Sequence, residues 1–224
     1  MNLSIVMPVL NEAAGIEAAL EALAPLRLRG TEVVVIDGGS RDGTAELARP
    51  LADRVVAARR GRAAQMNAGA AAATGNALLF LHADTWLPDD ADRLVRDGLR
   101  HRAWGRFDVR FAEGGALRLV ALMMNLRSRA TGITTGDQAM FMTRAAFERA
   151  GGFPDIVLME DVALSARLKR LCRPLCLSAR VTTSGRRWRR HGLFRTILLM
   201  WQLRLRYFLG ADPARLARAY GYDN

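Results

Sequence analysis

Residues 32–44 read EVVVIDGGSRDGT, an apolar run that ends in an acidic loop rich in glycine. The four consecutive β-branched residues at 33–36 are typical of a strand that is buried on both faces. Asp37 follows at the end of this strand, and Thr44 is placed to cap the helix that comes next. A buried strand, a polar loop and a helix in this order predict one unit of an α/β fold with a parallel sheet.

The same alternation extends to both sides of this unit. Residues 3–7 form an earlier apolar run, and residues 54–57 and 77–81 form two later runs, with helical patterns between them. Further on, residues 104–111 alternate bulky and charged side chains, which predicts a half-buried strand. We therefore expect a mainly parallel sheet flanked by helices, in one domain over residues 1–185.

In the second half of this domain, the sequence predicts three more helices and one short strand. Residues 117–126 indicate an amphipathic helix in which Met123 and Met124 fill the core. The expected strand covers 139–142, and the other two helices cover 144–150 and 161–171. Cys172 and Cys176 are too few for a zinc site and lie one helical turn apart, so we expect buried free thiols.

The chain carries 33 basic and 22 acidic residues, a net charge of +11 that would suit nucleic acid or an anionic membrane. Residues 1–185 hold 24 basic and 20 acidic residues, whereas residues 186–218 hold nine arginines and one acid. The excess charge therefore belongs mainly to the C-terminal extension, residues 186–224. The sequence contains no recognisable nucleic-acid motif, so we expect no nucleic-acid partner.

The extension predicts an amphipathic helix. Apolar residues recur at helical spacing and basic or polar residues lie on another side; the first set is Phe194, Ile197, Leu198, Trp201, Leu205 and Phe208, and the second is Arg195, Gln202 and Arg206. Such a helix can lie on an anionic membrane, pack on the catalytic domain or form a homodimer. With no signal peptide and no spanning segment recognised, the expected location is cytoplasmic, with peripheral attachment to the inner face of the plasma membrane as one alternative.

Polar clusters follow three of the expected strands, at residues 8–12, 37–44 and 82–85. The carboxyl ends of parallel strands meet at one edge of a sheet, and ligands of open α/β folds bind there. The acids, glycines and hydroxyl groups of these clusters are suited to a nucleotide. The alternative is that the glycines and aspartates of residues 37–43 serve only as turn residues.

Taken together, these clusters resemble family 2 glycosyltransferases. The match is carried, in the family's order, by residues 4–12, 33–44, 61–69, 79–85, 151–153 and 159–164. Within the family, the chain is most similar to the small bacterial group called radical SAM/selenodomain-associated transferase 2. The resemblance implies a GT-A, Rossmann-like fold and an inverting transfer of sugar from a nucleotide-sugar donor to an unidentified acceptor, either a lipid or a small molecule. It also implies a divalent cation, Mg²⁺ or Mn²⁺.

The family's motifs assign roles to individual residues. Donor binding falls to Pro8, Glu12, Asp37, Arg62, His82, Arg186, Arg187 and Trp188. Asp84 matches the last acid of the family's Asp-x-Asp motif and is assigned the metal. His82 stands where the first acid is expected, which implies either a hydrogen bond to ribose or weaker metal dependence. We expect a UDP-sugar as the donor. The motif gives little support for the choice of uridine, because Gly38 replaces a frequent second acid.

Glu160 and Asp161 match the family's Glu-Asp pair and are the catalytic candidates. Inverting transfer requires a base that takes a proton from the acceptor as the new bond forms. Adjacent helical residues point about 100° apart, so only one of the two acids is expected to be the base, and we assign that role to Asp161. The alternative is that these carboxylates only stabilise the start of a helix.

Two other functions remain open from the sequence. One is a basic peripheral membrane-binding module without transferase activity. The other is a nucleotidyltransferase on a related fold, which would be expected to carry more glycine and basic residues after the first strand, where residues 8–12 include an acid instead.

Overall fold

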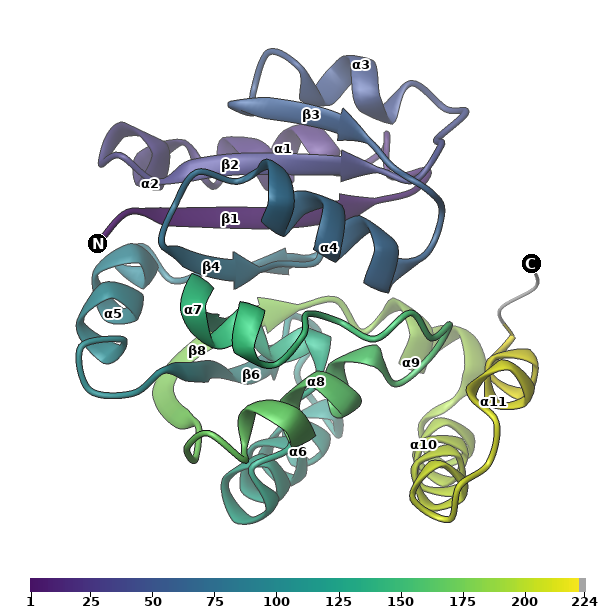
Figure 1. Ribbon diagram of the computed structural model, residues 1–224. Coiled ribbons are helices and arrows are strands. Elements are labelled where there is room, and N and C mark those ends of the chain that lie inside the picture. Colours follow the sequence, from purple (N-terminus) through teal and green to yellow (C-terminus); the bar gives the residue numbers. More distant parts are fainter. Residues whose placement is uncertain (222–224) are drawn as a thin grey trace.

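The computed structural model describes residues 1–221 and all their side chains except those of Arg187, Arg190 and His191. One eight-stranded sheet crosses the molecule in the order β3-β2-β1-β4-β7-β6-β8-β5 (Figure 1). Its strands are β1 (Leu3–Val9), β2 (Glu32–Asp37), β3 (Arg54–Ala57), β4 (Ala77–Phe80), β5 (Thr85–Trp86), β6 (Trp104–Phe111), β7 (Phe141–Thr143) and β8 (Leu175–Thr183).

The first four strands form the parallel unit that the sequence predicts. Strand β1 lies between β2 and β4 and is parallel to both, and β3 adds a parallel strand at the edge. Strand β7 then runs antiparallel to β4 and to β6, while β8 is parallel to β6 and antiparallel to β5. The result is a mixed sheet whose parallel half brings the ends of β1, β2 and β4 to one edge.

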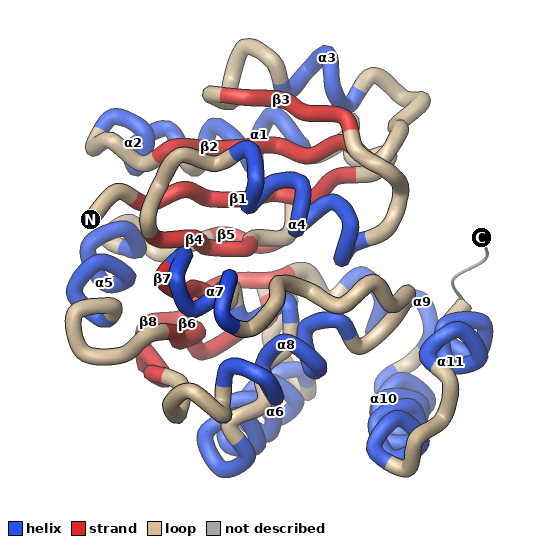
Figure 2. The backbone as a smooth tube through the Cα atoms, viewed as in Figure 1, coloured by secondary structure: helices blue, strands red, loops and turns tan. Residues whose placement is uncertain are grey.

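Helices cover both faces of the sheet (Figure 2). They are α1 (Ile16–Glu21), α2 (Ala24–Leu28), α3 (Thr44–Ala48), α4 (Arg62–Ala72), α5 (Ala91–Gly98), α6 (Leu117–Thr131), α7 (Arg144–Arg149), α8 (Glu160–Leu168), α9 (Arg186–His191), α10 (Leu193–Phe208) and α11 (Pro213–Tyr220), with a 3₁₀ turn, η1, at Gly136–Gln138. Buried residues of α1, α2, α3, α5 and α6 share one core, and those of α4, α7 and α8 share the other.

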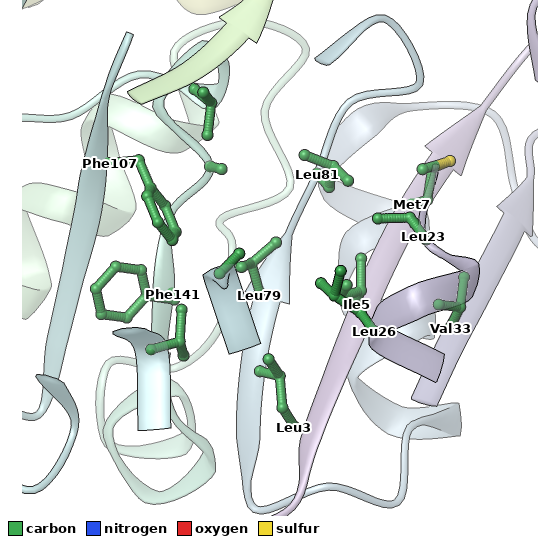
Figure 3. Packing of buried hydrophobic residues seen from close by; sticks show 14 of the residues in the cluster. Leu3, Ile5, Met7, Leu23, Leu26, Val33, Leu79, Leu81, Phe107 and Phe141 are labelled. Carbon is green, nitrogen blue, oxygen red and sulfur yellow. The ribbon is translucent and has the colours of Figure 1, made fainter. Parts of the chain in front are cut away.

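The two cores lie on opposite sides of β1 because side chains alternate along a strand. Leu3, Ile5 and Met7 point to the α1 and α2 side, where they pack near Leu23 and Leu26 (Figure 3). Val6 points the other way, toward α4, where Gly69 approaches so closely that a Cβ atom would lie 2.2 Å from the Val6 Cγ1 atom. This close approach packs α4 directly against β1.

In this region one strand was not predicted and two predictions differ in degree of burial. Strand β8, which was not predicted, contains Cys176 and begins after Cys172; both thiols are free, as expected, but half-buried instead of buried. Strand β6 is buried on both faces instead of one, with Arg106 fully buried. Arg106 is tolerated there because it pairs with Asp108 and donates to the Ser128 hydroxyl of α6.

Helix α6 also differs from its prediction. It continues five residues beyond the expected end at residue 126, and Met123 is 52% exposed instead of filling the core. Met124 is half-buried and packs against the core as expected. The Asn125 side chain donates to the Val109 carbonyl and accepts from its amide, so α6 is hydrogen-bonded to β6.

The C-terminal extension consists of α9, α10 and α11. Leu203 of α10 and Leu216 of α11 are buried with Leu158 and Val162, which anchors the extension to the α8 side of the domain. The predicted apolar face points elsewhere: Phe194, Leu198, Trp201, Leu205 and Phe208 are each at least 61% exposed, and only Ile197 packs against the core. Over residues 1–221, no helix is long and apolar enough to span a membrane.

Candidate active site

A cleft of about 690 Å³ opens at the carboxyl edge of the parallel strands. Predicted donor-binding residues from four separate segments line it, namely Pro8, Glu12, Arg62, His82, Arg186 and Trp188, together with the predicted metal ligand Asp84. Trp188 is fixed by an edge contact with Phe111, their ring centres 5.8 Å apart. The side chain of Arg187 lies outside the described part of the structure.

Asp37 is the one described donor-binding candidate that does not line the cleft. Its carboxylate accepts hydrogen bonds from the amides of Gly39 and Ser40 and so closes its own loop. That loop is tied to the β1–α1 loop, because Asn11 accepts from the Arg41 amide and donates its own amide to Ser40. The turn interpretation of residues 37–43 therefore accounts for the contacts of Asp37.

Arg186 joins two acids of the cleft. Its Nη2 atom lies 3.3 Å from Asp84 Oδ2 and 3.6 Å from Glu12 Oε2. Burial raises the pKa of Glu12, the charge of Arg186 lowers it and the charge of Asp84 raises it, with a net upward shift. Arg186 thus balances two negative charges that would otherwise repel each other across the cleft.

The cleft fits a divalent cation through Asp84. This carboxylate is half-buried and faces the cleft. Magnesium in nucleotide sites is commonly held by one or two carboxylates together with substrate phosphates, so one acid beside a diphosphate is a sufficient protein ligand set. Among residues 1–221, no group of three or more His, Cys, Asp or Glu side chains is arranged to hold a metal ion without a substrate.

His82 lines the cleft and contacts η1. Its Nδ1 atom lies 3.6 Å from Asp137 Oδ1. Its ring packs so tightly on Gly136 that a Cβ atom there would lie 2.4 Å from His82 Cε1. The amide of Gly136 in turn donates to Asp161 Oδ2 at 2.7 Å, so η1 connects His82 with the predicted base.

The two acids at the start of α8 have different surroundings. Glu160 is 3% exposed, and its Oε1 atom lies 4.0 Å from Arg62 Nη1. Asp161 is half-buried and accepts hydrogen bonds from the amides of Gly136 and Val162. Glu160 therefore faces the cleft's Arg62, whereas Asp161 faces η1, as expected for neighbouring residues that point in different directions.

Glu160 is poised for proton exchange near neutral pH. Burial and the charge of Asp161 raise the pKa of Glu160 to about 7, against an opposing effect of Arg62. Carboxyl groups with pKa values in this range are common in active sites, because acid–base catalysis is most effective near the working pH.

Backbone strain is concentrated beside these side chains. Within residues 1–221, three non-glycine residues have a positive φ: Asn11 at 55°, Ala139 at 44° and Met159 at 70°. Asn11 precedes Glu12, Ala139 follows η1, and Met159 precedes Glu160. Each therefore lies next to a segment that supplies a side chain to the site.

We expect Glu160→Gln to reduce the dependence of stability on pH. Between pH 4.5 and about 7, the folded protein holds a proton on Glu160 that the unfolded chain has released. Stability of the wild type therefore falls as the pH rises through this window, by up to about 3 kcal/mol for this one group. Thermal unfolding at about pH 5 and about pH 8 measures the effect. Glu148→Gln, on the exposed side of α7, is the control and should keep the wild-type profile.

Comparisons with known proteins identify the family. Residues 4–150 match the model of "Glycosyl transferase family 2", and the chain belongs to that family. The succinoglycan biosynthesis protein ExoA of Rhizobium meliloti is 43% identical over 110 residues, which cover 42% of this chain and 32% of that protein. The chain thus spans about a third of the length of this relative. Family 2 glycosyltransferases are enzymes. The comparisons do not support the two alternatives, a membrane-binding module without activity and a nucleotidyltransferase.

Solved structures show the same fold. The mannosyltransferase PcManGT from Pyrobaculum calidifontis, in complex with GDP-Man and Mn²⁺, has a TM-score of 0.68 and 22% identity and covers 99% of this chain and 69% of its own. Residues 1–349 of TarS from S. aureus, in complex with UDP-GlcNAc, have a TM-score of 0.68 and 19% identity over 83% of this chain and 59% of that one. The mixed sheet and its flanking helices are therefore a GT-A fold.

Some residues of this site were not predicted. Tyr220 of α11 lines the cleft, and so do Arg59 and Asp155, which pair with each other at 2.6 Å. Gln65 is buried and donates to the carbonyls of Val9 and Ile36, which joins α4 to two strand ends. A polar residue in the alanine-rich helix was the one sequence signal for this contact. Tyr220 carried no signal, because it enters the site from the far end of the chain.

Proposed function

We propose that the protein transfers a sugar from a nucleoside diphosphate sugar to an acceptor, with inversion at the anomeric carbon. The observation that carries this proposal is the convergence of Asp84, Glu12, Arg186 and Arg62 on one cleft beside the parallel strand ends. The donor's diphosphate would lie among these groups, because guanidinium forks suit phosphate oxygens. Trp188 would lie on the same side of the donor as Arg186.

Asp84 would hold a divalent cation, Mg²⁺ or Mn²⁺, jointly with the donor's phosphate oxygens. When bound, such an ion neutralises the charge that grows on the leaving diphosphate. Arg186 adds a positive charge at the same place, since its guanidinium already reaches Asp84. Donor binding therefore has to rearrange the contact between Arg186 and the two acids.

Asp161 would accept the proton of the acceptor hydroxyl as the bond to the sugar forms. Its position favours this role, because it is less buried than Glu160 and lies beside η1 instead of against Arg62. Glu160, held opposite Arg62, would position that arginine for the donor. The two hydrogen bonds from backbone amides fix the Asp161 carboxylate in one orientation.

A donor screen tests the proposal directly. Thermal shift of the wild type with UDP-sugars and GDP-sugars, each with Mn²⁺, Mg²⁺ or a chelator, should show stabilisation by at least one nucleotide sugar. The effect should be larger with the metal than with the chelator. A protein that is stabilised by no nucleotide sugar under any of these conditions would refute the proposed function.

Gly136→Ala is expected to lower transfer activity about tenfold or more while the protein stays folded. The added methyl group would lie 2.4 Å from the His82 ring, so either the ring or η1 has to move. Because the Gly136 amide also holds Asp161, that movement displaces the proposed base, and small displacements of catalytic groups cost up to about 10²-fold. Steady-state kinetics measures the loss. Gly15→Ala, where a Cβ atom meets nothing within 4 Å, should keep wild-type activity.

We further propose that the exposed face of α10 binds an anionic membrane surface. Phe194, Leu198 and Trp201 are between 66% and 80% exposed on a helix that also carries exposed Arg195 and Arg206. Aromatic and leucine side chains flanked by arginines are typical of helices that lie in a membrane interface. Each basic residue near an anionic surface adds about 1 kcal/mol of attraction.

Vesicle co-sedimentation tests this surface. The wild type should bind vesicles of phosphatidylcholine mixed with phosphatidylglycerol more strongly than vesicles of phosphatidylcholine alone. Trp201→Ser combined with Leu205→Ser should weaken binding about tenfold, since two large apolar side chains are removed from the interface. Leu28→Ser, at a residue 90% exposed on α2, is the control. If the double variant instead abolishes a dimer and leaves vesicle binding unchanged, α10 is a subunit interface.

A further inference from the structure

The charge of Asp161 acts on two arginines from distant parts of the chain. One of them, Arg204, follows Leu203, which is buried together with Val162, the residue after Asp161. Arg127 belongs to α6 and Arg204 to α10, and both are half-buried. Burial and the charge of Arg204 lower the pKa of Arg127 to about 10, against an opposing effect of Asp161. Burial lowers the pKa of Arg204 as well, against opposing effects of Asp161 and Asp137. Two like charges are therefore held near each other beside the proposed base.

The Arg127 side chain has hydrogen-bonding groups without partners. Its Nε and Nη2 atoms are buried, and neither has a hydrogen-bond partner within the described residues. These two nitrogens lie on the same edge of the guanidinium, the edge that binds two oxygens of a phosphate or carboxylate at once. A buried donor left unsatisfied costs about 1–3 kcal/mol, so this arrangement is unfavourable unless a ligand supplies the acceptor.

No carboxylate of residues 1–221 forms an ion pair with Arg127 or Arg204. The acids nearby are already engaged: Asp137 lies against His82, and both oxygens of Asp161 accept backbone amides. The Thr134 hydroxyl, in the segment between α6 and η1, is also buried without a partner among the described residues. Its amide donates to Ser165 of α8, which places Thr134 beside the same helix as Asp161.

We propose that Arg127 and Arg204 bind a phosphate group carried by the acceptor, beside Asp161. The inference rests on the proposed transferase function, because it assigns these arginines to the second substrate. A phosphate offers several acceptor oxygens and up to two negative charges, which matches two guanidinium groups better than a neutral sugar or alcohol does. Tyr220, which lines the cleft, packs in the same apolar cluster as Leu203, the residue before Arg204, so a phosphate at this point would hold the acceptor against the donor cleft.

The phosphate could belong to a soluble ester or to a lipid, and the experiment has an arm for each. Inorganic phosphate is titrated by calorimetry in the presence of saturating nucleoside diphosphate and Mn²⁺, which fill the donor cleft. Vesicles of phosphatidylcholine with phosphatidic acid are tested by co-sedimentation under the same conditions. The variants are Arg127→Gln and Arg204→Gln. The matched controls are Arg118→Gln on α6 and Arg206→Gln on α10, two exposed arginines that remove the same charge.

In the soluble arm, we expect Arg127→Gln and Arg204→Gln each to weaken phosphate binding at least about tenfold, in line with the loss of one charge-assisted contact, while the controls stay within about twofold. If the two variants also bind vesicles more weakly than the controls do, the phosphate belongs to a lipid. If they lose only the binding of inorganic phosphate, it belongs to a soluble ester. Binding that is unchanged by both variants, in both arms, overturns the proposal.

Two further readouts separate this proposal from simpler explanations. Thermal stabilisation by the donor and metal should persist in Arg127→Gln, so a failed phosphate site and a failed transferase function give different results. Arg127→Gln should also leave the melting temperature of the ligand-free protein unchanged or higher, because it removes a buried, repelled charge. A lower melting temperature with unaltered phosphate binding would show that Arg127 has only a structural role and would overturn the proposal.

Discussion

Asp84→Asn is expected to lower kcat/KM for sugar transfer by at least about 10²-fold. In the proposed function, Asp84 is the protein's ligand to the divalent cation, and asparagine keeps the shape of the side chain but removes its charge. The same change removes the ion pair with Arg186, which leaves Glu12 as the charged partner of that guanidinium. Metal affinity and turnover should therefore fall together, while the fold is retained.

The measurement is a titration of initial rates with Mn²⁺ and Mg²⁺ at saturating donor. Asp84→Asn should require far more metal to reach its lower maximum rate. Asp90→Asn is the matched control, because Asp90 is exposed nearby and its side chain makes no capping hydrogen bond. A variant with wild-type rate and metal requirement would exclude Asp84 as the ligand.

Asp161→Asn is expected to lower kcat by about 10²–10⁴-fold with little change in donor binding. An amide cannot take the acceptor's proton, yet its oxygen can still accept one of the two backbone hydrogen bonds that orient Asp161. The loss should therefore appear in the chemical step and not in the stability of the donor complex. Donor affinity measured by thermal shift provides that separation.

Glu160→Gln supplies the comparison for this prediction. It neutralises the neighbouring acid and should retain much more activity than Asp161→Asn, since Glu160 is buried opposite Arg62. Asp97→Asn, on the exposed surface of α5, controls for the loss of one negative charge. If Glu160→Gln abolishes turnover and Asp161→Asn does not, the roles of the two acids have to be exchanged.

The sequence was sufficient for the parallel half of the sheet and for strands at the positions of β6 and β7, but not for β5 and β8. Strands β1, β2 and β4 are short apolar runs with polar ends, a pattern that depends only on local residues. Strand β8 is mostly half-buried, with no regular alternation over its first three residues, and it pairs with the distant β6. The burial of Arg106 also depends on distant partners, since Ser128 and Asn125 of α6 satisfy it.

The candidate site shows the same division. Motifs that follow strands could be recognised one by one, and most of their residues line one cleft. Asp37 did not reach the cleft because its own loop uses its carboxylate. Arg127 and Arg204 could not be selected from the many arginines of this chain, since the influence of Asp161 on both arises only in the folded chain, from residues on three separate helices.

The left-handed backbone at Asn11, Ala139 and Met159 implies a trade-off between thermal stability and activity. A residue with a side chain in this conformation costs about 1–2 kcal/mol relative to its relaxed state, and natural domains are stable by only about 5–15 kcal/mol. Replacing Ala139 or Met159 by glycine would remove this conformational free energy. It would also make the segments that position Asp137 and Glu160 more flexible. A selection for heat resistance alone would therefore be expected to erode catalysis at these positions first.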